Sequence, residues 1–140
     1  MCDEMKQEIR KLAFRLNDAY KSMNDIIAEI ESILISVQLP YPVWVAENTS
    51  DNPTQLQFGL AKTDKQWRIA YRIASDGSQN ENEHSAVFPS TADIRRRCLL
   101  ILPQLVSAVI AAAEQECLEI EHSLEQAKQI LQEFKNTFCQ

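Results

Sequence analysis

Apolar residues recur every three and four positions through residues 3–37, and this spacing predicts one long amphipathic helix. They fall in two series in which neighbouring members are seven residues apart: Ile9, Leu16, Met23, Ile30 and Val37, and then Leu12, Ala19, Ile26 and Ile33. The two series occupy heptad positions a and d, which is typical of a coiled coil. We expect the helix to end before Pro40 and Pro42, because proline cannot continue a helix.

A third set of apolar residues follows position d and widens the stripe on this helix. Its members are Ala13, Tyr20, Ile27 and Leu34. A stripe of this width buries more surface than a two-helix seam can cover. We therefore expect Tyr20, Ile27 and Leu34 to lie at an oligomer interface with a second chain, as in a four-helix bundle with a dyad. The expected partner is the protein itself, in a homodimer.

Residues 43–75 alternate apolar and polar side chains and predict a small antiparallel β-meander of three strands. The alternation is clearest over residues 56–60 and 67–73. Gly59, inside the second strand, indicates a bulge or a close contact. Residues 76–89 are mostly polar and read as a loop, with a short extended piece at residues 86–88.

Heptad spacing returns in residues 91–138, which predict a second long helix capped by Ser90 or Thr91. Pro103 lies inside it and is expected to kink it or to break it in two. Beyond Pro103 the apolar residues again form two series: Ile110, Cys117, Leu124, Leu131 and Phe138, and then Val106, Ala113, Ile120, Ala127 and Phe134.

Together these segments predict a single α+β domain over residues 1–140. The first helix ends where the β-meander begins, and the second helix starts where the β-region is complete. The apolar seams of the two helices are of equal length and both adjoin the β-region. This arrangement favours an antiparallel helical hairpin of the coiled-coil or bundle type. Charge supports this orientation, because the hairpin sets four basic residues opposite four acidic ones: Arg10, Lys11, Arg15 and Lys21, and Glu125, Glu121, Glu119 and Glu116.

The composition narrows the classes of function. The chain has 140 residues and a formal net charge of −6, and this acidity argues against general binding to nucleic acid or to anionic membranes. No basic stretch precedes an apolar run at the N-terminus, and the longest unbroken apolar runs are too short to span a bilayer. We therefore expect a cytoplasmic protein without a membrane partner.

The small number of glycines and the spacing of the cysteines exclude further classes of function. The two glycines are too few for a phosphate-binding or dinucleotide-binding loop, and none of the four cysteines forms a C-x-x-C pair. Cys2 and Cys139 would face each other across the helix ends of the hairpin, where unpaired thiols are expected. We predict no catalytic residue, no cofactor and no metal site. The adjacent Glu121 and His122 point to different faces of a helix and do not suit one ion.

Arg95, Arg96 and Arg97 form the one local cluster that suggests binding. Three cations near a helix N-terminus oppose the helix dipole, so something should compensate them. One interpretation is internal salt bridges with carboxylates such as Glu29 and Glu31. The other is an anion such as a nucleotide, held with the help of two arginines on the polar face of the third strand, Arg68 and Arg72.

The sequence favours a non-enzymatic protein–protein interaction module, such as an oligomeric helical scaffold, an adaptor or a chaperone-like protein. One alternative is a small acidic inhibitor of a host system, of the kind that phages and mobile elements encode. A second alternative is an anion-binding or nucleotide-binding module built on the arginine cluster. The sequence does not specify the partner, the pathway or the orientation of chains in an oligomer.

Overall fold

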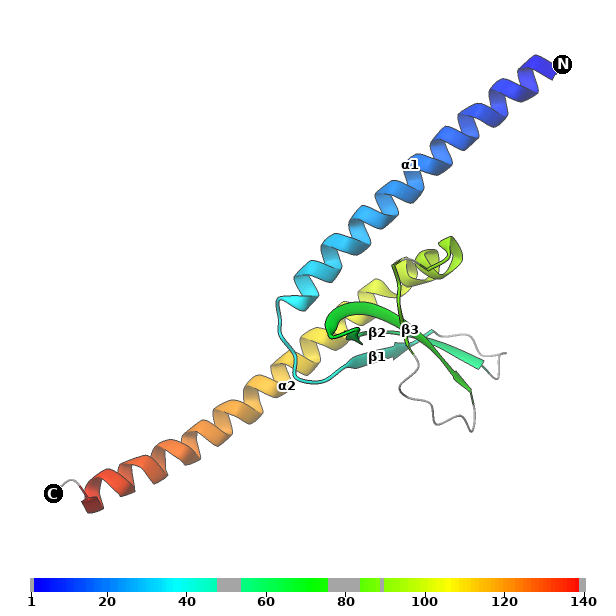
Figure 1. Cartoon of the computed structure of the whole chain (residues 1–140). Helices are drawn as coiled ribbons and strands as arrows, with labels where there is room; N and C mark the ends of the chain where they lie inside the picture. The colour runs from blue at the N-terminus through cyan, green and yellow to red at the C-terminus, as the bar shows by residue number, and fades with distance from the viewer. Residues whose placement is uncertain (1, 48–53, 76–83, 89, 139–140) are drawn as a thin grey trace.

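The structure, a computed structural model, is described for residues 2–47, 54–75, 84–88 and 90–138. It is an α+β fold, as the sequence predicted. Two long helices extend from a small body that contains a β-sheet (Figure 1). The elements in chain order are α1 (Cys2–Ile35), β1 (Val43–Ala46), β2 (Thr54–Thr63), β3 (Gln66–Ser75), β4 (Ser85–Ala86) and α2 (Ala92–Phe138).

The sheet has four antiparallel strands in the order β1-β2-β3-β4. The prediction of three strands was therefore wrong. The fourth strand, β4, is only two residues long and pairs with Ala70 and Tyr71 of β3. Two residues are too few to show the alternation that reveals a strand in a sequence.

The long hairpin of β2 and β3 closes through a two-residue turn. Thr63 pairs with Gln66, and the residues between them, Asp64 and Lys65, have φ angles of 49° and 70°. Two consecutive positive φ angles define a type I′ turn, whose twist matches that of the flanking strands. This turn fixes the register that places the apolar side chains of both strands on one face.

The core lies where both helices meet the sheet. Phe58 of β2, Ile69 of β3, Ile27 of α1 and both Leu105 and Val109 of α2 are fully buried in one cluster. The predicted face of the hairpin is buried at Leu56, Phe58, Leu60 and Ile69, but Ile73 at its end is 63% exposed. Ala61 and Ala70 on the other face are also buried, so the predicted contrast between a buried and an exposed face holds only in part. The partly buried carboxylate of Glu31 in α1 accepts a hydrogen bond of 2.8 Å from the backbone N–H of Ile69. This bond fastens α1 to the sheet.

The two helices are not paired as the predicted antiparallel hairpin. They run in the same direction and overlap only where the C-terminal part of α1 passes the N-terminal part of α2 (Figure 1). Near the start of α2, Arg95 Nη1 donates to Asn24 Oδ1 at 2.7 Å. Farther along α2, Tyr41 just after α1 donates from its hydroxyl to the carbonyl oxygen of Ala112 at 3.4 Å. The chain from Asn24 to Tyr41 therefore runs beside α2 from Arg95 to Ala112 in the same direction.

α2 continues without interruption through Pro103, which is exposed. The expected break in the helix does not occur. Thr91 caps the helix, as one of the two expected caps, because its hydroxyl accepts a hydrogen bond of 3.3 Å from the N–H of Ile94. The first turns of α2 therefore start at a fixed place beside the sheet.

Candidate interaction surface

The first 21 residues of α1 form a projecting arm. Every residue from 2 to 22 is exposed, and this segment is called the N-terminal arm below. Five of its six large apolar side chains follow the helical repeat, and the sixth, Phe14, lies on the opposite face. The six are between 38% and 77% exposed: Met5, Ile9, Leu12, Phe14, Leu16 and Tyr20. The stripe is too long and too continuous to be scattered surface apolar residues.

The last 22 described residues of α2 form a second arm. Every residue from 117 to 138 is exposed, and this segment is called the C-terminal arm. Its large apolar side chains are between 49% and 71% exposed: Leu118, Ile120, Leu124, Ile130, Leu131, Phe134 and Phe138. The two arms leave the body at opposite ends of the molecule (Figure 1).

The apolar stripe on α1 passes from the exposed arm into the body of the chain. Met23, at 8% exposure, is the first buried residue of the helix. Two of the three residues expected at an oligomer interface, Ile27 and Leu34, are buried in the core of the same chain, and only Tyr20 is exposed. Over the last turns of α1 the stripe is therefore wide because its residues pack in the core of the same chain. The unpartnered apolar surface lies instead on the arms.

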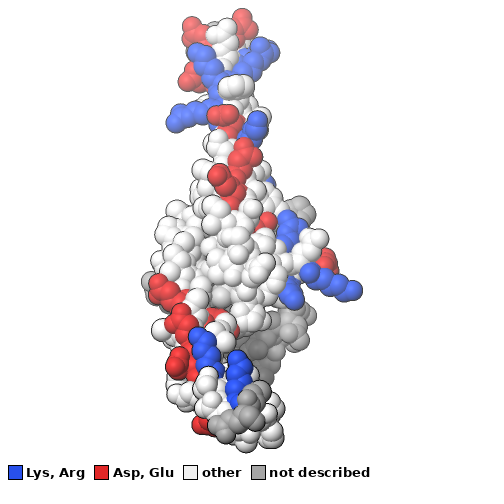
Figure 2. Space-filling model, turned by 90° about the vertical axis from the view of Figure 1, so that its left-hand side faces the viewer, with Lys and Arg blue, Asp and Glu red and all other residues white. Residues whose placement is uncertain are grey.

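Charge along the arms is partly segregated. On the N-terminal arm most acidic residues lie near the tip (Asp3, Glu4 and Glu8) and most basic ones closer to the body (Arg10, Lys11, Arg15 and Lys21), with Lys6 and Asp18 as exceptions. On α2 the order is reversed: acidic residues start next to the body (Glu114, Glu116, Glu119, Glu121 and Glu125), and lysines lie toward the tip (Lys128 and Lys135), with Glu133 between them. Between the two arms, the side of the molecule seen in Figure 2 has a broad face without charged side chains.

Arg97 is held within the protein by an acidic residue of β1's C-terminal flank. Its Nε and Nη2 donate to the two carboxylate oxygens of Glu47 at 2.8 Å and 2.5 Å, and Asp93 lies 3.6 Å from Nη1. The hydrogen bond with Glu47 raises the pKa of Arg97 above its ordinary value. Glu47 and Asp93, rather than Glu29 and Glu31, thus compensate this end of the cluster.

The other four candidate anion-binding arginines also have partners within the chain. Arg95 donates to Asn24 and lies over Phe88, and Arg96 pairs with Asp93 at 3.0 Å. On β3, Arg68 lies 4.0 Å from Glu31, whereas Arg72 donates to Gln57 and lies 4.1 Å from the ring centre of Trp44.

These five guanidinium groups do not converge on one point. Arg96 and Arg97 line one pocket, Arg68 lines a second and Arg72 lines a third. The structure thus places the candidate residues without assembling them into a single anion site. The sequence could show the run of three arginines, but not that successive helical positions direct them to different neighbours.

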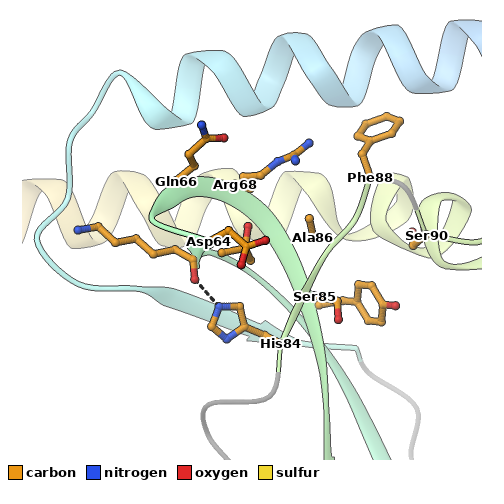
Figure 3. A pocket seen from close by; sticks show the side chains of 11 residues that line it. Asp64, Gln66, Arg68, His84, Ser85, Ala86, Phe88 and Ser90 are labelled. Atoms are coloured by element: carbon orange, nitrogen blue, oxygen red, sulfur yellow. Dashed lines mark hydrogen bonds between the residues drawn. The ribbon is translucent and has the colours of Figure 1, made fainter.

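One pocket lies between the turn of the β2–β3 hairpin and the segment that carries β4 (Figure 3). It encloses about 740 Å³ and is lined by Lys62, Arg68, Tyr71, His84 and Phe88 among others. Nε2 of His84 lies 2.5 Å from the carbonyl oxygen of Lys62, while its Nδ1 has no hydrogen-bond partner among the residues that the structure describes. The pocket carries basic groups and one acidic residue, Asp64, so its lining is mixed. The sequence could not show that His84 lies beside the hairpin turn, because it stands 22 positions after Lys62 in the chain.

The remaining candidate chemistry is sparse in the part of the chain that the structure describes. Within these ranges no three His, Cys, Asp or Glu side chains come together as metal ligands. Cys98 is buried, whereas Cys2 and Cys117 are exposed and all three are free thiols. The proposed facing of Cys2 and Cys139 cannot be placed, because Cys139 lies outside the described residues.

α2 has the length and apolar composition of a membrane-crossing helix. The expectation from unbroken apolar runs missed this, because uncharged polar residues can lie between the apolar ones in such a helix. In this chain the apolar side chains Cys98, Leu105 and Val109 of α2 are fully buried in the core. Core packing therefore accounts for part of its apolar character.

Comparisons of the chain with protein-family models, with curated proteins and with solved structures found no match. Function must therefore be inferred from the surface of the molecule itself.

Proposed function

We propose that this protein is a non-enzymatic protein–protein interaction module that associates with itself through the apolar stripes of its two helical arms. The observation that carries the proposal is the complete exposure of residues 2–22 and 117–138, both of which keep heptad spacing. A scaffold, an adaptor or a chaperone-like protein is the class of function that such arms suit.

Helical arms that expose a stripe of apolar side chains to water are unfavourable in free energy. Helices in proteins owe most of their stability to the packing of an amphipathic face, and the exposed arms lack such packing within the chain. Covering one Leu, Ile or Phe side chain contributes roughly 1.5–3 kcal/mol. Each arm exposes at least six large apolar side chains, so association would stabilise both the helix and the complex.

Light scattering coupled to size-exclusion chromatography tests the proposal. At micromolar concentration we expect a mass near twice the 16.0 kDa of one chain. Leu124→Glu should convert this species to monomer, because the substitution places a charge in the seam of the C-terminal arm. Leu124 is 49% exposed in the single chain, so its replacement should leave the body folded.

Gln129→Glu is the matched control. It adds the same charge to an exposed position on the opposite side of the same arm and should leave the dimer intact. A protein that remains monomeric at micromolar concentration, or a Gln129→Glu variant that dissociates as readily as Leu124→Glu, would contradict the proposal.

A further inference from the structure

We infer that the N-terminal arm of one chain pairs antiparallel with the C-terminal arm of a second copy, so that the dimer is held by two reciprocal arm pairs. This inference rests on the proposed self-association and adds to it the identity, direction and register of the helices that meet. The expected hairpin of the two seams then forms between chains instead of within one.

The directions of the arms lead to this arrangement. α1 and α2 run the same way and project from opposite ends of the body (Figure 1). A two-fold axis perpendicular to the helices therefore brings the C-terminal arm of the second copy to the N-terminal arm of the first. Because the axis reverses the chain direction, the paired arms are antiparallel, tip beside tip and base beside base. The same axis creates the second pair at the other end.

The lengths of the arms agree with such a pairing. The N-terminal arm has 21 residues and the C-terminal arm has 22. At 1.5 Å per residue these segments are about 32 Å and about 33 Å long. When their bases are aligned, neither arm leaves a long apolar overhang.

The seams also fall into register. With the bases aligned, positions a and d of one arm meet positions d and a of the other at every layer. The layers would be Ala19 with Cys117, Leu16 with Ile120, Leu12 with Leu124, Ile9 with Ala127 and Met5 with Leu131. All ten side chains belong to the exposed arms, so none has to leave the core of its own chain.

Charge favours this pairing over a parallel pairing of like arms. Arg10, Lys11, Arg15 and Lys21, near the base of one arm, would lie along the acidic residues near the base of the other, from Glu114 to Glu125. At the tips most signs are exchanged, with Asp3, Glu4 and Glu8 along Lys128 and Lys135, and the exceptions Lys6 and Glu133 are themselves of opposite sign. A parallel pair of two C-terminal arms would instead set Glu119, Glu121 and Glu125 of one arm against the same three residues of the other, which is unfavourable at close range.

Cysteine crosslinking tests the inference in the full-length chain. All proteins carry Cys2→Ser and Cys139→Ser, which leaves the buried Cys98 and the exposed Cys117. The first protein adds Ala19→Cys and Cys117→Ser, and the second keeps Ala19 and Cys117 and carries a tag that increases its mass. The thiol introduced at position 19 can then face Cys117 only between different chains. Both substituted positions are exposed, so the fold should tolerate the changes.

We expect oxidation of the two co-expressed proteins to give a disulfide-linked heterodimer on a non-reducing gel. Either protein oxidised alone should stay almost entirely uncrosslinked. A crosslinked homodimer of the first protein would indicate parallel N-terminal arms, and one of the second protein would indicate paired C-terminal arms. Either result would overturn the inference.

A third protein, which carries Ala19→Cys and keeps Cys117, distinguishes a closed chain from an exchanged one. A fast-migrating, internally crosslinked monomer would mean that the hairpin closes within the chain, and the inference would fail. If light scattering shows a dimer but co-expression yields no heterodimer crosslink, the arm pairing is wrong and the proposed function stands. If light scattering shows only monomer, both are wrong.

Discussion

Gly59 shows how a single residue shapes the sheet. A Cβ atom at this position would lie against the carbonyl oxygen of Val43 and 2.6 Å from Cε3 of Trp44. The Trp44 side chain thus lies over the glycine, with the guanidinium of Arg72 on its ring and His84 at its edge, 5.5 Å between ring centres. The sequence predicted a bulge or a close contact at Gly59, and the close contact is confirmed. It could not name Trp44, because strand pairing brings the two residues together.

Cys98 provides a prediction about pH at the residue scale. Burial, with a smaller contribution from the negative charge of Glu31, raises the pKa of Cys98 from 9.0 to about 12. Between these two values the unfolded chain loses the thiol proton and the folded chain keeps it. The free energy of unfolding should therefore fall as pH rises from 9 to 12, by at most about 1.4 kcal/mol per pH unit from this group. Below pH 9 this group should have no effect.

The measurement is urea unfolding of the parent and of Cys98→Ala across this pH range. Cys98→Ala should be less stable at neutral pH, because it leaves a small cavity, but its stability should decline less steeply above pH 9. Cys2→Ala removes an exposed thiol near the N-terminus instead and should keep the parent slope. Equal slopes for the parent and Cys98→Ala would contradict the assigned pKa.

At the scale of elements, the long helices and the two longest strands could be predicted because each repeats a clear period many times. α1 and α2 end within two residues of the predicted limits, 3–37 and 91–138. β4 could not be predicted, because its two residues depend on the hydrogen bonds that β3 offers. Pro103 was expected to break or kink its helix, and the break does not occur, because the helix continues through it. Packing of the neighbouring Ile101, Leu102 and Leu105 on the sheet outweighs the local preference.

Pro103→Ala should therefore stabilise the protein. Proline lacks the N–H that would bond to the carbonyl of Leu99, and its ring crowds that turn, at a typical cost of about 3 kcal/mol in a helix interior. The side chain is exposed, so its loss leaves no core cavity. We expect a gain of roughly 1–3 kcal/mol in chemical denaturation, less than the full cost if the helix has adapted to the ring.

Gln104→Ala, at the next exposed position, is the control for helix propensity alone and should change stability by only a few tenths of a kcal/mol. A loss of stability in Pro103→Ala would show that the local shape of α2 at the proline is required for its fit to the sheet.

At the scale of the whole molecule, the sequence predicted two matching seams but assigned their pairing to one chain. Periodicity and charge specify which surfaces are complementary, and they are the same whether the partner helix belongs to the same chain or to another. Tertiary contacts decide where the seams can pair. The hydrogen bond between Arg95 and Asn24 fixes the overlap of the two helices, and Ile27 and Leu34 of the wide stripe are buried in the core of the same chain. The arms that remain are then free for a second copy.

Because the body is stabilised within one chain and the arms by a second copy, we predict that helix content depends on protein concentration. The arms contain more than half of the residues of α1 and α2, and few contacts within the chain support them. Dilution below the dissociation constant of the dimer should therefore melt the arms and leave the body folded. Circular dichroism at about 222 nm should lose a large part of its helical signal on dilution. The near-ultraviolet signal of Trp44 and Trp67, both in the body, should persist.

The monomeric Leu124→Glu variant should show the reduced helical signal at every concentration, and Gln129→Glu should follow the parent curve. High salt should move the parent transition to higher protein concentration, because it screens the complementary charges of the arms. A parent whose helical signal per residue stays constant from the dimeric to the monomeric range would show that the arms are stable without a partner. Exposure of their apolar stripes would then no longer argue for association.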